Sequence, residues 1–168
     1  MPGHPAASVF PESLVASREN PALRYRLVKS HFAVHGKDRP VDAKDALLHF
    51  PAENIAVHAS AQRANVAMAP ADAEYAVYET TAGGTLSVPT GWIYVRFAVG
   101  TKLGDSAGAF DAAGYRIVRK LSYAPHAGWV TAASGGIAAS LNGIGRLDAI
   151  PGIEEVAPQM LSKAARKD

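Results

Sequence analysis

Histidine is the side chain best suited to acid–base or metal chemistry near neutral pH, and six histidines are scattered along the chain. His31 and His35 fall on one face of an alternating segment, roughly 13 Å apart at the rise of a β-strand. That separation is too large for two ligands of one metal ion. We therefore expect surface or hydrogen-bonded histidines, and we predict neither a metal site nor a cofactor. The six are His4, His31, His35, His49, His58 and His126.

The residues that usually act as nucleophiles or acid–base pairs also lack the spacing that catalysis needs. The chain contains no cysteine, which excludes disulfides, thiolate metal ligands and a cysteine nucleophile. Ser134-Gly135-Gly136 is better explained as a turn into a helix than as a nucleophile site, and no Ser/His/Asp order is legible along the chain. Glu154 and Glu155 are adjacent on a predicted strand, so their carboxylates point to opposite faces. No glycine-rich phosphate loop occurs. These observations predict that the protein is not an enzyme.

The composition predicts a folded, soluble chain with one domain or two small ones, because 48% of its 168 residues are apolar. The formal net charge of +2 is too small to indicate a nucleic-acid partner. No apolar run is long enough to span a bilayer, and Met1-Pro2-Gly3-His4-Pro5 lacks the features of a secretory signal. We expect a cytoplasmic protein, or a piece of a larger chain, with no membrane partner. The oligomeric state stays open.

The first half of the chain is expected to supply a leader and a small sheet. Residues 1–20 are predicted to be a flexible leader, because they contain three prolines and no sustained periodicity. Residues 21–86 form a small β-rich segment, in which Asp42 is placed to cap a short helix that ends at Leu48. The alternating patterns of this segment predict strands over residues 24–35, 54–59, 64–69 and 74–80.

The second half, residues 87–161, follows the order strand, helix, strand, strand, helix, strand. Its clearest strand is Trp92 to Val99, whose side chains alternate between two faces. One face carries Ile93, Val95, Phe97 and Val99, and the other carries Trp92, Tyr94, Arg96 and Ala98. After it we expect a helix ending near Ala113, strands over 115–121 and 128–133, a helix over 137–147 and a strand over 153–157.

This order predicts the α+β class, as a ferredoxin-like βαββαβ antiparallel sheet with both helices on one face. The small β-rich segment precedes it as a separate part, and residues 162–168 form a polar tail. Such a fold serves many functions, so the fold alone does not identify one.

Four stretches of residues 87–161 resemble the N-terminal prodomain of subtilisin-like serine proteases. Residues 91–101, GWIYVRFAVGT, are similar to its first strand, and residues 112–118, AAGYRIV, to its first helix end and second strand. Residues 121–130, LSYAPHAGWV, resemble its central hairpin. The most specific likeness is LDAIPGIEEVAP, residues 147–158, which resembles the family's Leu-x-x-(Ile/Leu)-Pro-Gly-Val-x-x-Val-x-Pro ending. The likeness covers Ser87 to Leu161.

The resemblance implies a non-enzymatic module that binds and inhibits a subtilisin-like serine protease, or assists its folding, in cis or in trans. It implies that Trp92, Tyr94 and Trp129 lie on the surface that docks on the protease. It also implies that the extended C-terminal segment lies in the substrate cleft, where main-chain hydrogen bonds and alternate side chains would hold it. The residues of that segment are Val156, Ala157, Pro158, Gln159, Met160 and Leu161.

Two other functions remain open from the residues alone. The chain can be a protein-interaction or regulatory domain that has no link to a protease. Alternatively, Trp92, Tyr94 and Trp129 can stack the bases of single-stranded RNA, although the Lys/Arg-Gly-Phe/Tyr-Gly/Ala-Phe segment of RNA-recognition domains is absent.

Overall fold

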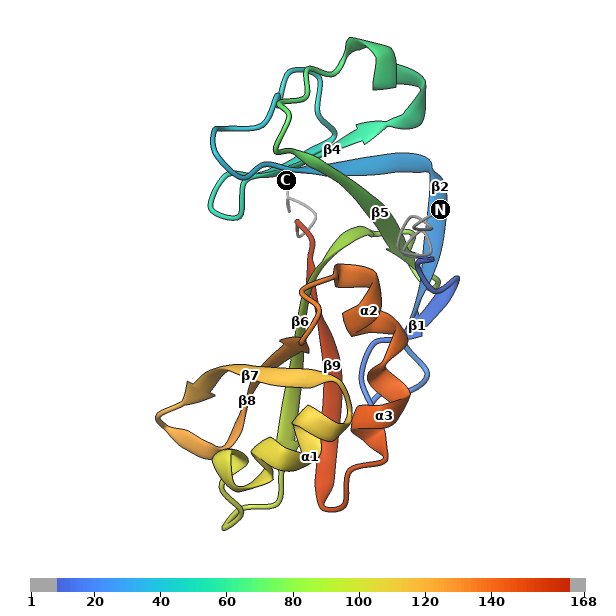
Figure 1. Ribbon diagram of the computed structural model, residues 1–168. Helices are drawn as coiled ribbons and strands as arrows, with labels where there is room; N and C mark the ends of the chain where they lie inside the picture. The colour runs from blue at the N-terminus through green and yellow to red at the C-terminus, as the bar shows by residue number, and fades with distance from the viewer. Residues whose placement is uncertain (1–8, 164–168) are drawn as a thin grey trace, which may run out of the picture. The chain divides into compact units, whose positions relative to one another are not determined.

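The computed structural model describes residues 9–163, and these residues are mainly β-structure with a few short helices (Figure 1). The chain divides into two compact units. Of the described residues, unit 1 comprises 9–25 and 89–160, and unit 2 comprises 26–88 and 161–163. The strands are β1 (Ser13–Val15), β2 (Arg24–His35), β3 (Leu48–Phe50), β4 (Ile55–Ala59), β5 (Ala73–Thr80), β6 (Leu86–Phe97), β7 (Tyr115–Leu121), β8 (Ala124–Ala132) and β9 (Ile153–Leu161). The helices are the 3₁₀ turns η1 (Ser60–Asn65) and η2 (Leu103–Ser106), and the α-helices α1 (Ala107–Ala112), α2 (Ile137–Asn142) and α3 (Ile144–Asp148).

Hydrogen bonds join the nine strands in a single sheet, in the order β3-β4-β2-β5-β6-β8-β7, with β1 beside β2 and β9 beside β6. The predicted fold class, a ferredoxin-like βαββαβ sheet preceded by a separate β-rich segment, is therefore wrong. The physical reason lies in β6, which begins at Leu86 instead of Trp92. Its first residues pair antiparallel with β5, Tyr78 opposite Ser87 and Glu79 opposite Leu86. The strand thus continues the pairing of the preceding segment.

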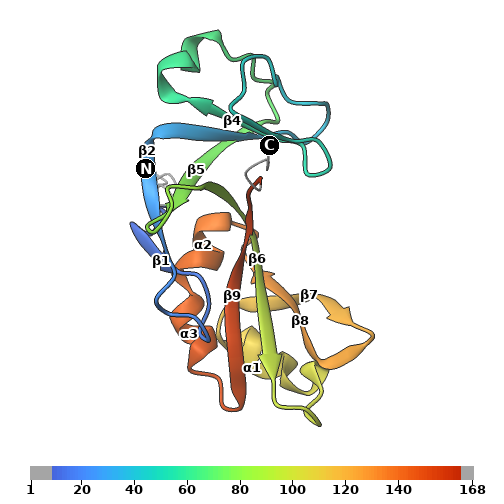
Figure 2. The same cartoon turned by 180° about the vertical axis from the view of Figure 1, so that it is seen from behind.

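Within unit 1, the helices cover one face of the strands β9, β6, β8 and β7. Figures 1 and 2, which view the molecule from opposite sides, both place α1, α2 and α3 on the same side of β6 and β9. The residues of β6 that face the helices are buried, and the ring of Phe97 lies edge-on to that of Phe110 in α1, with 6.0 Å between centroids. Burial of such side chains stabilises a fold by about 1.5–3 kcal/mol each. The opposite face of these strands carries no helix within residues 9–163.

Within unit 2, apolar side chains are buried on both faces of the sheet, because neighbouring residues of β2 and β4 alternate between two apolar clusters. Ala33 packs with Val57 in one cluster, and Phe32 packs with Ala56 in the other. Their strands pair antiparallel, with Ala33 opposite Val57 and Phe32 opposite His58. The partly buried Leu161, at the end of β9, joins the first cluster.

Most predicted strands are confirmed as individual elements, and two local predictions in unit 2 are wrong. The helix expected from Asp42 to Leu48 does not form, because the Asp42 carboxylate accepts hydrogen bonds from the backbone N–H groups of Lys44 and Ala67 and holds an irregular loop. The strand expected over residues 64–69 is instead the end of η1 and an irregular segment.

The described part of the predicted flexible leader, residues 9–20, contains β1 and makes specific contacts. Leu14 is buried, and the Asn142 side chain in α2 donates a hydrogen bond to the carbonyl of Val9. Residues 1–8, with His4, and residues 164–168 of the predicted polar tail lie outside the described residues.

Candidate protein-docking face

Three aromatic side chains gather on the helix-free face of unit 1, and we call Trp92, Tyr94 and Trp129 the aromatic face. The Trp92 and Trp129 rings lie 6.2 Å apart between centroids, and the Tyr94 and Trp129 rings lie 5.5 Å apart in an edge-on arrangement. Distances of this size are typical of favourable aromatic pairs, which add about 0.5–1.5 kcal/mol each beyond burial. The sequence-based expectation that the three share one face is confirmed.

The strand alternation and the pairing of β6 with β8 produce this grouping. Along β6, Trp92 and Tyr94 are half-buried, whereas the intervening Ile93 and Val95 are fully buried on the helix side. Tyr94 lies directly opposite Trp129 in the antiparallel register, and opposite residues project to the same face. The aromatic face therefore rests on a rigid strand pair, and its rings keep part of their surface available to a partner.

An ion pair lies beside the aromatic face, on the same side of β6. The guanidinium of Arg96, two residues after Tyr94, donates to the carboxylate of Glu19. The hydrogen bond from Arg96 lowers the pKa of Glu19, and the same bond raises the pKa of Arg96. The alternation of β6 predicts the direction of Arg96, but no local pattern identifies a partner 77 residues away.

A buried carboxylate fastens the leader segment to β9. Glu155 is only 6% exposed, and its Oε1 accepts hydrogen bonds from the backbone N–H groups of Arg18 (2.8 Å), Val156 (2.9 Å) and Glu19 (3.4 Å). The Arg18 guanidinium also donates to the carbonyl of Ile153 at 2.7 Å. Sequence reasoning missed this cluster, because adjacent glutamates on a strand carry no sign of which one is buried.

The segment expected to enter a protease cleft, Val156 to Leu161, lies in β9. Its residues are extended, as expected, and β9 pairs with β6. Val156 is buried, its carbonyl accepts a hydrogen bond from the N–H of Arg18, and the Thr90 hydroxyl donates to Gln159 at 2.7 Å. Ala157, Gln159, Met160 and Leu161 are half-buried and Pro158 is buried. The structure therefore places this segment in a strand of the sheet, beside the strand β6 that carries Trp92 and Tyr94.

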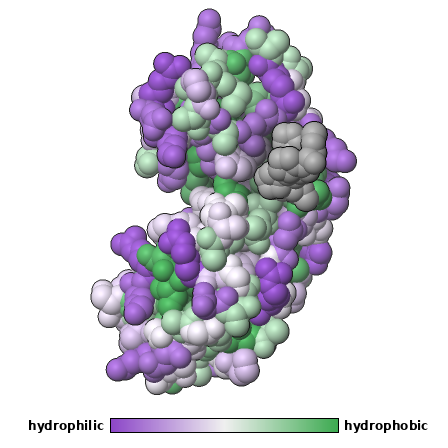
Figure 3. Space-filling model, in the orientation of Figure 1, coloured by the Kyte–Doolittle hydropathy of each residue, from purple (hydrophilic) through white to green (hydrophobic). Residues whose placement is uncertain are grey.

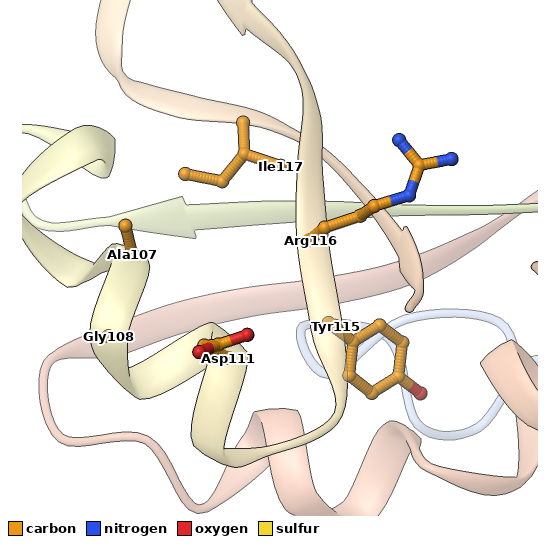
Figure 4. A pocket seen from close by; sticks show the side chains of 6 residues that line it. All are labelled: Ala107, Gly108, Asp111, Tyr115, Arg116 and Ile117. Atoms are coloured by element: carbon orange, nitrogen blue, oxygen red, sulfur yellow. The ribbon is translucent and has the colours of Figure 1, made fainter. Parts of the chain in front are cut away.

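The helix side of unit 1 carries an open hollow of 350 Å³ between α1 and β7. Figure 4 shows the Ile117 side chain pointing toward Ala107 at the start of α1, and Arg116 pointing the other way. Apolar surface also appears over this part of the molecule in Figure 3. Asp111 is the only carboxylate among the lining residues, so the hollow has no pair of carboxylates for acid–base chemistry.

The described residues also contain no group of three or more His, Asp or Glu side chains that could hold a metal ion. No helix within residues 9–163 is both long and apolar enough to cross a membrane. Comparison with known proteins found no matching family model, no matching curated protein and no matching solved structure. The aromatic face groups three large, half-buried rings on a paired strand support of unit 1.

Proposed function

We propose that this chain is a non-enzymatic module that binds a subtilisin-like serine protease through the aromatic face and thereby inhibits the protease or assists its folding. The observation that carries the proposal is the cluster of Trp92, Tyr94 and Trp129 on a helix-free sheet face. Aromatic anchors on a rigid support are the side chains that most often dominate protein–protein binding energy. The resemblance of residues 147–158 to the prodomain ending supplies the class of partner.

The proposal assigns the C-terminal segment a second role. In the bound state, residues at the end of β9 leave their present pairing and lie in the substrate cleft as an added strand. Pro158 has a fixed φ angle, which lowers the entropy lost on docking. The hydrogen bonds now made by this segment, such as that between Thr90 and Gln159, would be exchanged for bonds to the protease.

Inhibition of subtilisin and related proteases tests the proposal. Peptide hydrolysis is followed while the full chain is titrated, and we expect inhibition at micromolar concentration or below. Trp129→Ala removes the ring that contacts both other members of the face, and we expect it to weaken inhibition about tenfold or more. Tyr123→Ala removes an aromatic ring that is 83% exposed and outside the cluster, and it should leave inhibition unchanged.

Equal inhibition by the wild-type chain and Trp129→Ala would remove the aromatic face from the proposal. Failure of the wild-type chain to inhibit any subtilisin-like protease in the panel would overturn the partner class. Circular dichroism of each variant establishes that the fold is retained.

A second candidate is a protein-interaction or regulatory domain with no link to a protease. The observation in its favour is the placement of Val156 to Leu161 in β9, where these residues are already hydrogen-bonded and packed. On this alternative the aromatic face still binds a protein, but the partner has no need of the C-terminal segment. Met160→Asp places a charge in the C-terminal segment and should keep this segment out of a protease cleft. A protein partner that binds the Met160→Asp variant as tightly as wild type would favour this alternative.

A further inference from the structure

A polar hollow of 320 Å³ lies in unit 2, and no residue of the aromatic face lines it. It opens between an irregular loop, the end of β4 and the 3₁₀ turn η1. Its volume is at the low end of the range for small-molecule sites, about 300–1,000 Å³. The lining residues are Lys44, Asp45, His58, Gln62, Asn65 and Val66.

His58 gives the hollow a buried polar wall. Its side chain is 0% exposed and stacks on Phe32, with 5.7 Å between ring centroids. Nε2 lies 2.9 Å from the backbone carbonyl oxygen of Asp42. Because a carbonyl oxygen only accepts, Nε2 carries the ring proton, and a neutral ring then presents Nδ1 as an acceptor.

That acceptor is buried without a partner among the described residues. An unsatisfied buried polar atom destabilises the folded state, so native proteins rarely keep one unless it has a use. The neighbouring positions of the same cluster, Val34 and Ala56, are apolar, and an apolar side chain at position 58 would avoid the cost. His58 is one of the lining residues, so a molecule bound in the hollow that reaches the ring and donates an O–H or N–H to Nδ1 would remove the cost.

The walls of the hollow are braced in place. The Asp42 carboxylate accepts from the N–H of Lys44 at 3.0 Å and from that of Ala67 at 2.9 Å, which ties the loop to the segment after η1. These two backbone hydrogen bonds hold the pKa of Asp42 below its usual value, so the brace stays ionised at neutral pH. A preformed site loses less entropy when a ligand binds.

The rim offers one charge of each sign and two amides. Lys44 and Asp45 are exposed, and neither takes part in an ion pair among the described residues. Asn65 donates to the Gln62 oxygen at 3.1 Å, which leaves the Gln62 N–H groups and the Asn65 oxygen for other partners. This combination matches a ligand that carries both a positive and a negative group.

We propose that the hollow beside His58 binds a small zwitterion of the size of a free amino acid, which donates a hydrogen bond to His58 Nδ1 and places its charged groups toward Lys44 and Asp45. The site uses no residue of the aromatic face, so it is a binding function separate from the docking of a protease.

Two-dimensional NMR of the full, ¹⁵N-labelled chain tests this with the common amino acids added one at a time. We expect at least one of them to shift the His58 ring nitrogens and the Ala67 amide saturably at millimolar concentration. His58→Phe removes the acceptor and should weaken binding about tenfold or more.

Asp45→Asn is the second variant, and it separates binding from folding. Asp45 has a φ of +60°, a conformation that asparagine tolerates well, so the loop is retained while the negative charge is lost. We expect weaker amino-acid binding. Asp38→Asn makes the same charge change in the same loop outside the hollow, and it should leave binding unchanged.

The proposal is overturned if no amino acid shifts the His58 ring nitrogens, or if His58→Phe and Asp45→Asn both bind as tightly as wild type. It is also overturned if the Nδ1 signal shows that water is its hydrogen-bond partner and no added amino acid displaces that water. If His58→Phe does not fold, the ring-nitrogen shifts of the wild type and the Asp45→Asn titration decide.

Discussion

His35 ends β2 with its ring edge-on to Tyr75, 4.5 Å between centroids, and with a buried Nε2 that has no partner among residues 9–163. Burial lowers the pKa of His35 from 6.5 to about 4, because the charged ring would lose its hydration. The unfolded chain therefore binds more protons than the folded chain between these two values. The contribution of a neutral His35 is fully present above pH 6.5 and is lost as the pH falls toward 4.

We predict that the free energy of unfolding falls between pH 6.5 and pH 4 by up to about 3 kcal/mol through this group. Urea unfolding across the range measures the slope. His35→Gln should flatten it, whereas His31→Gln, four residues earlier on the same strand, should leave it in place. An unchanged slope in His35→Gln would show that the loss of stability arises elsewhere.

Asp42 is expected to contribute at lower pH. Its pKa is lowered from 3.8 mainly by the hydrogen bonds from Ala67 and Lys44, so its contribution is present above 3.8 and is lost as the pH falls through the lowered value. We predict that Asp42→Ala costs about 1–2 kcal/mol at neutral pH, and Asp42→Asn less, because the amide oxygen can keep one of the two bonds. Thermal unfolding measures both. Equal stability of all three proteins would contradict the prediction.

At the scale of single residues, the sequence could predict to which face of a strand each side chain points, because strand periodicity controls that direction. The alternation of β6 placed Trp92, Tyr94 and Arg96 on one face, and the structure has them there. It could not predict the ion pair of Arg96 with Glu19, or the burial of His58 and Glu155. Those depend on which distant segments meet, and no local pattern carries that information.

Among the elements, β9 is held on one side by β6 and fastened on the other by the leader segment through Glu155. We predict that Glu155→Ala destabilises the protein by about 1–3 kcal/mol, because backbone N–H groups lose their shared acceptor. Hydrogen exchange should accelerate most at the amides of Arg18 and Glu19. Glu155→Gln keeps an accepting oxygen and should have a smaller effect. Uniform acceleration across the protein would argue against a local fastening.

The elements that the sequence predicted well are those set by strand alternation and by turns. The strand over 115–121 has the expected bounds, and its hairpin with β8 is confirmed by their antiparallel pairing. The short helix expected after Asp42 failed, because the same side chain that can cap a helix can also hold a loop. The Asp42 bond to Ala67, 25 residues away, decides between the two outcomes.

For the whole molecule, the predicted fold class failed at the boundary between segments. The prediction began a separate part of the fold at residue 87, but β6 starts at Leu86 and pairs with β5. The strands β2 and β6, of 12 residues each, contribute to both units. The alternation of side chains along a strand is the same whichever strand it pairs with. Local periodicity therefore cannot predict that one long strand is shared between two units.

Leu161 belongs to the unit 2 core although it ends the last strand of the chain. We predict that Leu161→Ala destabilises unit 2 by about 1–2 kcal/mol, less than the loss of a fully buried leucine. Hydrogen-exchange protection should fall in β4 and β5 more than in the β7–β8 hairpin. Leu47→Ala, which truncates a leucine that is 52% exposed, is the control and should change little.

The position of Leu161 makes two equilibria compete for one side chain. If a protease takes up the end of β9, the cluster around Phe50 and Val57 must release Leu161, and the free energy of that release is subtracted from the affinity. By thermodynamic linkage the effect is reciprocal, so a bound protease loosens this cluster by the same amount. Leu161→Ala would then lower the stability of unit 2 and also lower the free-energy cost of releasing the end of β9. The variant would therefore be less stable than wild type and yet bind the protease more tightly.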